Sequence, residues 1–140
     1  MSIMRFVFTF LVCVLVAAPA DAGNLRALIG THFTETPSRV VDGDTIRMKN
    51  GAVRLWGFNT PEKYQPRFFA AAAKLEELVV GQKLDCHIRD IDRYQRRVAQ
   101  CYLPDGRDVG ELMVSSGLAR DYTRFSKGYY KRYEKLAFAQ

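Results

Sequence analysis

Three short segments of this 140-residue chain concentrate carboxylate, amide and guanidinium groups. They read DGDT at 42–45, RLWGFNTPE at 54–62 and DRYQRR at 92–97. Carboxylate and carbonyl oxygens can hold a hard divalent cation. Two arginines can bind a phosphate through paired hydrogen bonds, and one further carboxylate can orient or deprotonate a water molecule. Together the segments supply the groups that phosphodiester hydrolysis needs.

Each segment taken alone has a simpler explanation. Asp-Gly is a common turn sequence, and a loop rich in arginine is usually a solvated surface. The segment at 54–62 is more specific, because Arg54 and Glu62 enclose a strand end and a turn fixed by proline. This chemistry needs no histidine. We assign no role to His32 or His87, which we expect at ordinary surface or satisfied positions.

Four motifs occur in a fixed order along residues 38–138: V-D-G-D-T, R-L-x-G-x-x-T-P-E, D-R-Y-x-R and G-L-A. This set resembles the thermonuclease family, the staphylococcal-nuclease-like domain. The resemblance implies an α+β fold with a five-stranded OB-fold β-barrel and three helices. It also implies a calcium-dependent endonuclease that hydrolyses phosphodiester bonds of DNA and RNA and leaves 3′-phosphates.

The catalytic and substrate-binding residues of the family can be placed on the matching positions. Arg54 and Arg96 resemble the two phosphate-binding arginines, and Glu62 resembles the residue that activates water. Tyr94 and Tyr122 resemble tyrosines that line the nucleotide pocket. The resemblance therefore implies that the arginines stabilise the charge that develops on the phosphate in the transition state.

The same resemblance implies a Ca²⁺ site. Asp44 resembles a coordinating carboxylate, Thr60 would contribute its backbone carbonyl, and Asp42 resembles an acidic neighbour of the site. Asn59 stands where the family usually has a second coordinating aspartate. Because asparagine keeps a carbonyl ligand but removes a negative charge, we expect weaker calcium binding. Gln95, directly before Arg96, stands at a turn position where the family commonly has glycine.

Hydrophobic periodicity and turn signals predict the elements that carry these residues. The expected order is a loose lead-in at 23–37, two or three strands within 38–58, a helix at 66–80, strands at 83–88 and 97–103, a helix at 109–117 and an amphipathic stretch at 127–140. Asn50-Gly51 between alternating apolar segments is typical of a hairpin turn. Asp108 can cap the helix expected at 109–117. This order predicts a small α+β domain built on a closed or nearly closed barrel.

Two cysteines lie on the apolar faces of the strands expected at 83–88 and 97–103. Cross-strand neighbours lie close enough for a bridge if their registers match, so Cys86 and Cys101 are a candidate disulfide. The alternative is a pair of buried free thiols.

The first 22 residues have the pattern of a secretory signal peptide. One cation precedes an apolar run, and Ala20-Asp21-Ala22 supplies a small-residue cleavage site. The alternative is an uncleaved membrane anchor, although the run is short for a bilayer span of roughly 20 residues. We therefore predict a monomeric mature domain at 23–140, without membrane contact, that is exported to the periplasm or secreted.

Three functions are compatible with the sequence. The first is the exported calcium-dependent nuclease, because Arg54, Glu62 and Arg96 are all present. The second is a non-catalytic OB-fold domain that binds nucleic acid, for which a basic groove and stacking aromatics suffice and which Asn59 favours. The third is a basic protein that attaches to anionic envelope polymers, for which the net charge of +6 is the support.

Overall fold

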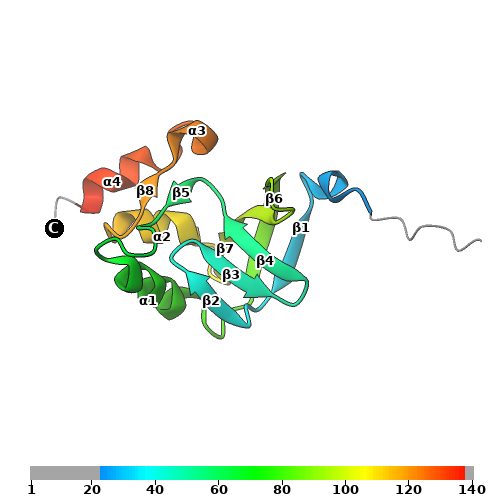
Figure 1. The fold of residues 1–140 in the computed structure, drawn as a ribbon, viewed down its shortest axis with the longest axis horizontal. Coiled ribbons are helices and arrows are strands. Elements are labelled where there is room, and N and C mark those ends of the chain that lie inside the picture. Colours follow the sequence, from blue (N-terminus) through cyan, green and yellow to red (C-terminus); the bar gives the residue numbers. More distant parts are fainter. Residues whose placement is uncertain (1–22, 138–140) are drawn as a thin grey trace, which may run out of the picture.

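A computed structural model of the chain describes residues 23–137 (Figure 1). The predicted signal peptide at 1–22 lies outside the described residues, as does the end of the amphipathic stretch beyond residue 137. The strands are β1 (His32–Glu35), β2 (Arg39–Asp42), β3 (Thr45–Met48), β4 (Gly51–Leu55), β5 (Phe58–Asn59), β6 (Leu84–Ile91), β7 (Arg97–Tyr102) and β8 (Arg120–Asp121). The helices are a 3₁₀ turn η1 (Leu25–Leu28), α1 (Phe68–Val79), α2 (Val109–Ser115), α3 (Thr123–Ser126) and α4 (Lys131–Ala137).

Six of the strands form one sheet in the order β1-β6-β7-β4-β3-β2, and β5 pairs with β8 in a separate two-stranded ladder. The β4–β7 pair is parallel and the other pairs are antiparallel. The large sheet curls, and helices α1, α2 and α4 gather at one side of it (Figure 1). This arrangement confirms the predicted α+β class and an OB-type curled sheet.

The numbers of strands and helices differ from the prediction. The main sheet has six strands where five were expected, and the described residues contain four α-helices where three were expected. The extra helix, α3, is a single turn of four residues. Within the part of the chain that the structure describes, no helix has the length and apolar character needed to cross a bilayer.

The additional strand comes from residues 23–37, which were wrongly expected to be a loose lead-in. Here β1 pairs with β6 in antiparallel register over four residue pairs, from His32 opposite His87 to Glu35 opposite Leu84. The strand is short and only half-buried on its inner face. Its formation depends on the free edge of β6, about 50 residues away, and a local sequence pattern does not reveal such a partner.

The predicted disulfide is confirmed. Cys86 on β6 lies directly opposite Cys101 on β7, and the two sulfurs are bonded at 2.08 Å. Both residues are buried in the hydrophobic core, which also contains Leu84 and Ala99 of the same strands. The bridge therefore joins two neighbouring inner strands of the sheet from the core side.

A buried polar cluster joins α2 to α4 and to the sheet. Asp108 is the N-cap of α2, where its Oδ1 accepts a hydrogen bond from Gly110 N at 2.8 Å. Its carboxylate also accepts hydrogen bonds from Tyr130 Oη at 2.9 Å and Gln100 Nε2 at 2.6 Å. Burial raises the pKa of Asp108, although these hydrogen bonds oppose the shift. A capping residue predicted from the sequence thus also positions the chain entering α4.

Candidate active site

One surface hollow of about 270 Å³ brings together side chains from the three chemically active segments. The sequence-predicted residues that line it are Asp42, Asp44, Arg54, Thr60, Glu62, Tyr94 and Arg96. They come from the β2–β3 turn, from β4, from the loop before α1 and from the β6–β7 loop. Residues that are far apart in the sequence therefore meet at one place, as the predicted chemistry requires.

Asp44 is held by the tight turn between β2 and β3. Its backbone N–H donates to Asp42 Oδ1 at 3.1 Å, which closes the turn. Gly43 is required between them, because a Cβ there would lie 2.7 Å from Thr60 Oγ1 and 2.8 Å from the Ala71 side chain. The glycine therefore allows this turn to lie directly against the loop that carries Thr60.

The Asp44 carboxylate is the most perturbed acidic group in the hollow. Thr45 Oγ1 donates to one oxygen at 3.1 Å, and Thr60 Oγ1 donates to the other at 3.2 Å. Burial raises its pKa from 3.8 to about 6. Arg54 opposes this shift, since its Nη2 lies 3.3 Å from Oδ2, whereas the nearby Asp42 adds to it. Arg54 only partly offsets the effect of burial on the Asp44 carboxylate. A further positive charge nearby would therefore stabilise its ionised form.

Arg54 is fixed by hydrogen bonds to the backbone around it. Its guanidinium donates to the carbonyl oxygens of Leu55 at 2.5 Å and Phe58 at 2.8 Å, and to Asn59 Oδ1 at 2.7 Å. The residue lies on β4 opposite Thr45 of β3, so the sheet register sets its position. These bonds orient the side chain in the hollow before any ligand binds.

Arg96 and Tyr94 are positioned by the short loop between β6 and β7. Asp92 accepts hydrogen bonds from the backbone N–H groups of Tyr94 at 2.8 Å and Arg96 at 2.9 Å, and its other oxygen accepts one from Arg96 Nε at 2.7 Å. Burial alone would raise the pKa of Asp92, but these bonds from Arg96 and Tyr94 lower it overall. Gln95 has φ of 60° in the left-handed region, which explains why glycine suits this position.

Glu62 lies on the loop before α1 and is exposed. Its backbone N–H donates to Gln65 Oε1 at 2.6 Å, and its carbonyl oxygen accepts from Gln65 N at 2.9 Å. This local turn follows Pro61, whose side chain also lines the hollow. The carboxylate thus reaches the hollow from irregular structure, whereas Arg54 reaches it from the sheet.

Two predicted residues lie outside the lining of this hollow. Asn59 is exposed and borders the adjacent hollow of about 350 Å³, but its Oδ1 contacts Arg54. Tyr122 packs its ring against Phe125, with ring centroids 4.7 Å apart, and its N–H donates to Gly57 O at 2.8 Å. The structure therefore brings Asn59 to the edge of the site and does not bring Tyr122 into it.

The oxygen-rich part of the hollow fits a hard cation such as Ca²⁺. Asp44 Oδ2 and Asn59 Oδ1 both contact the same guanidinium nitrogen, Arg54 Nη2, at 3.3 and 2.7 Å. Both oxygens therefore face the same guanidinium nitrogen, and Thr60 lies beside Asp44 Oδ2. Carboxylate, amide and carbonyl oxygens are the ligands that calcium prefers. A cation here would share these oxygens with Arg54.

Comparison with known families identifies the fold and the motifs. A family model described as staphylococcal nuclease homologue matches residues 52–140, which is more than half of the chain. The chain belongs to this family. The resemblance drawn from the four sequence motifs is thereby confirmed.

Several bacterial relatives are similar over most of the domain. An uncharacterized endonuclease of Escherichia coli O157:H7 is 34% identical over 92 residues, which cover 63% of this chain and 60% of that protein. The succinoglycan biosynthesis protein ExoI of Rhizobium meliloti is 30% identical over 128 residues, or 84% of this chain and 64% of its own length. The micrococcal nuclease of Shigella flexneri is 29% identical, covering 73% of this chain and 67% of its length. The matched region of this chain thus spans less than two thirds of the first two relatives.

Sequence reasoning missed two residues that shape the site. Phe68, the first residue of α1, lines the hollow and packs against Phe69 with ring centroids 5.2 Å apart. Asp92 is the first residue of a motif but was given no role, and its hydrogen bonds hold the β6–β7 loop. An aspartate followed two and four residues later by backbone donors is a recognisable turn signal and could have identified that role.

Proposed function

We propose that the protein is an exported calcium-dependent nuclease that hydrolyses phosphodiester bonds of DNA and RNA and leaves 3′-phosphates. The observation that carries this proposal is the convergence of Arg54, Arg96, Asp44 and Glu62 on one hollow. Membership of the staphylococcal nuclease homologues and the names of its relatives support nuclease chemistry.

The two arginines bind the phosphate in this mechanism. Arg54 is held by backbone carbonyls and Arg96 by Asp92, so both guanidinium groups are oriented in advance. Preorganised donors stabilise charge that develops on the phosphate oxygens without reorganising during the reaction. Loss of one such donor typically lowers the rate by about 10²–10³-fold.

Glu62 is the group that prepares the attacking water. It lines the hollow and is exposed to solvent. A carboxylate in this place can accept a proton from water as the oxygen attacks phosphorus. Asp44, Asn59 and the Thr60 carbonyl are the ligands proposed for Ca²⁺. When bound, the cation supplies positive charge that polarises the phosphodiester.

The surface around the hollow suits a nucleic-acid chain without strong sequence preference. Tyr94 is 63% exposed, and the guanidinium groups of Arg93 and Arg96 lie 4.8 and 5.4 Å from its ring centroid. Aromatic rings next to cationic groups bind unstacked bases and their phosphates. Because stacking does not depend on the 2′-hydroxyl, this surface is compatible with both DNA and RNA.

The decisive experiment measures degradation of single-stranded DNA with calcium and then with a chelator. We expect cleavage with calcium only, and a loss of at least about 10²-fold in the Glu62→Gln variant, within the range of general acid–base catalysis. Glu76→Gln is the matched control, because Glu76 is an exposed carboxylate of α1 outside the hollow. Equal activity of Glu62→Gln and Glu76→Gln would refute the role of Glu62.

A second function, a non-catalytic nucleic-acid-binding domain, is favoured by one observation. Asn59 replaces a charged ligand, and Arg54 already engages both Asn59 and Asp44. The same DNA assay separates the two functions. Binding of single-stranded DNA with no cleavage at any calcium concentration would establish the binding domain and exclude the nuclease.

Export is proposed from the predicted signal peptide at 1–22 and is supported by the Cys86–Cys101 disulfide, since such bonds persist in oxidising compartments. Expression of the full chain in a bacterial host, followed by fractionation and N-terminal sequencing, tests it. We expect a monomeric product beginning at Gly23 outside the cytoplasm. An uncleaved chain that stays with the membrane fraction would favour the anchor.

A further inference from the structure

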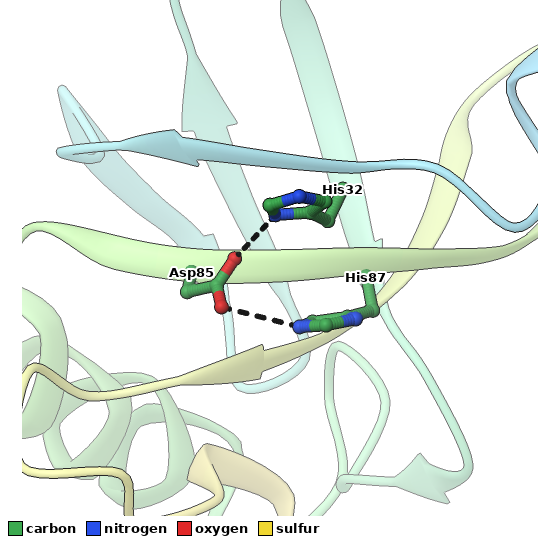
Figure 2. Close-up of side chains that lie close together, drawn as sticks. All are labelled: His32, Asp85 and His87. Atoms are coloured by element: carbon green, nitrogen blue, oxygen red, sulfur yellow. Dashed lines mark hydrogen bonds and ion pairs between the residues drawn. The ribbon is translucent and has the colours of Figure 1, made fainter.

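Both histidines of the chain meet one aspartate on the outer face of the sheet (Figure 2). His32 of β1 and His87 of β6 are direct partners across the antiparallel pair. Asp85 precedes His87 by two residues on β6, so it lies on the same face of the strand. The sequence places the two histidines 55 positions apart, and the register of one strand pair brings them together.

The side chains of His32, Asp85 and His87 lie close enough together to share one metal ion. His32 Nδ1 lies 3.2 Å from Asp85 Oδ1, and His87 Nε2 lies 3.2 Å from Asp85 Oδ2. One ligand atom from each residue lies within 4.8 Å of the other two. In a tetrahedral zinc site with bonds of about 2.0–2.1 Å, neighbouring ligand atoms lie roughly 3.3 Å apart. Each imidazole nitrogen thus lies about this far from one Asp85 oxygen, His32 Nδ1 from Oδ1 and His87 Nε2 from Oδ2.

The backbone under the cluster is fixed. Cys86, between Asp85 and His87, points into the core and is bonded to Cys101 of β7. The two imidazole rings are stacked, with centroids 5.4 Å apart and planes inclined by 23°. The two strands that carry these side chains are therefore held in one register by their pairing and, through Cys86, by the disulfide.

The cluster is open to solvent on one side. The exposed fractions of the His32, Asp85 and His87 side chains are 66%, 45% and 47%. An open hollow of about 470 Å³ borders Asp85, His87 and Tyr102. A cation can therefore enter freely, and water can complete its coordination. None of the three residues lines the hollow that contains Asp44 and Glu62.

We propose that His32, Asp85 and His87 form a binding site for a divalent transition metal such as Zn²⁺. Two imidazoles and one carboxylate are typical ligands of zinc, copper and nickel, whereas calcium and magnesium take oxygen ligands. This donor set therefore differs in kind from the oxygen-only set at Asp44 and Asn59. The metal links β1 to β6 and fastens the edge strand to the sheet.

Calorimetric titration of tag-free protein with zinc chloride, in the presence of excess calcium, tests the proposal. We expect one zinc ion per chain and a loss of at least about tenfold in affinity in His32→Ala, His87→Ala and Asp85→Asn. Thr34→Ala, opposite Asp85 on β1, and Glu62→Gln, in the other hollow, are matched controls that keep zinc binding. Zinc should also raise the midpoint of thermal unfolding of the wild type but not of the His32→Ala/His87→Ala variant.

A measurement on the unmodified chain avoids any effect of substitution on folding. The protein has two histidines, so its NMR spectrum contains two imidazole spin systems. Both should shift together and reach saturation at one equivalent of zinc. Zinc binding that survives in the double histidine variant, or imidazole signals that do not respond to zinc, would overturn the proposal.

Discussion

The raised pKa of Asp44 makes a quantitative prediction about the stability of the protein. The difference between an ordinary value of 3.8 and about 6 corresponds to roughly 3 kcal/mol. The folded state binds the Asp44 proton more tightly than the unfolded state does. The contribution of Asp44 to the free energy of unfolding is therefore greatest below pH 4. It falls as pH rises toward 6, where the carboxylate ionises in the folded protein. The ionised, buried Asp44 therefore destabilises the calcium-free protein at neutral pH.

Substitution of Asp44 by asparagine removes this charge and keeps the shape. In a calcium-free buffer, we expect the stability of Asp44→Asn relative to wild type to increase by up to about 3 kcal/mol between pH 4 and pH 8. Urea unfolding at a series of pH values measures the difference. The variant should lose activity while gaining stability at neutral pH, since the group that costs stability is the proposed calcium ligand.

Asp92→Asn is the matched control, because the pKa of Asp92 is shifted in the opposite direction. Although burial acts to raise it, hydrogen bonds from Arg96 and Tyr94 lower this pKa. Asp92→Asn should therefore be less stable than wild type at neutral pH. This difference in the free energy of unfolding should shrink as the pH falls below 4, because wild type then loses the contribution of the ionised Asp92. Addition of calcium should stabilise wild type and not Asp44→Asn. A stability difference between Asp44→Asn and wild type that is the same at pH 4 and pH 8 would refute the reasoning.

Three further predictions concern the metal site and the core. Asn59→Asp restores a charged ligand and should lower the calcium concentration for half-maximal DNA cleavage by about tenfold, or about 1.4 kcal/mol; an unchanged or higher requirement would contradict it. Replacing Cys86 and Cys101 together by alanine opens a loop with a sequence separation of 15. The free energy of unfolding measured in urea should fall by about 3 kcal/mol. An unchanged free energy of unfolding would show that the bridge does not form. Gly110→Ala should cost about 2–3 kcal/mol, because the new Cβ would lie 2.5 Å from Tyr130 Oη; wild-type stability in thermal unfolding would contradict this contact.

Local signals in the sequence predicted much of the fold. Asn50-Gly51 marks the β3–β4 hairpin, Asp108 caps α2, and Cys86 and Cys101 alternate onto the core face of their strands. Each of these features depends on residues within a few positions of one another, apart from the partner strand of each cysteine. Turn chemistry, capping and period-two alternation therefore sufficed for them.

The sequence did not predict features that arise from pairing between distant segments. β1 exists because β6 offers a free edge, and the cluster of His32, Asp85 and His87 exists because that pairing has one register. For the candidate active site, the motifs identified most of the residues that line the hollow, but not Phe68. They could not place Tyr122, whose ring position depends on its contact with Phe125 and on how the β8 segment packs.

Phosphate binding and activation of water, the two proposed steps of the reaction, depend on residues that different parts of the fold hold in place. Arg54 lies on β4, which pairs in parallel with β7, and Asp92 holds Arg96 in the loop directly before β7. Glu62 instead lies on the exposed loop before α1. Shortening or lengthening that loop should alter the turnover rate while leaving phosphate affinity nearly constant. A change in the loop before α1 can therefore alter the activation of water without moving the two arginines.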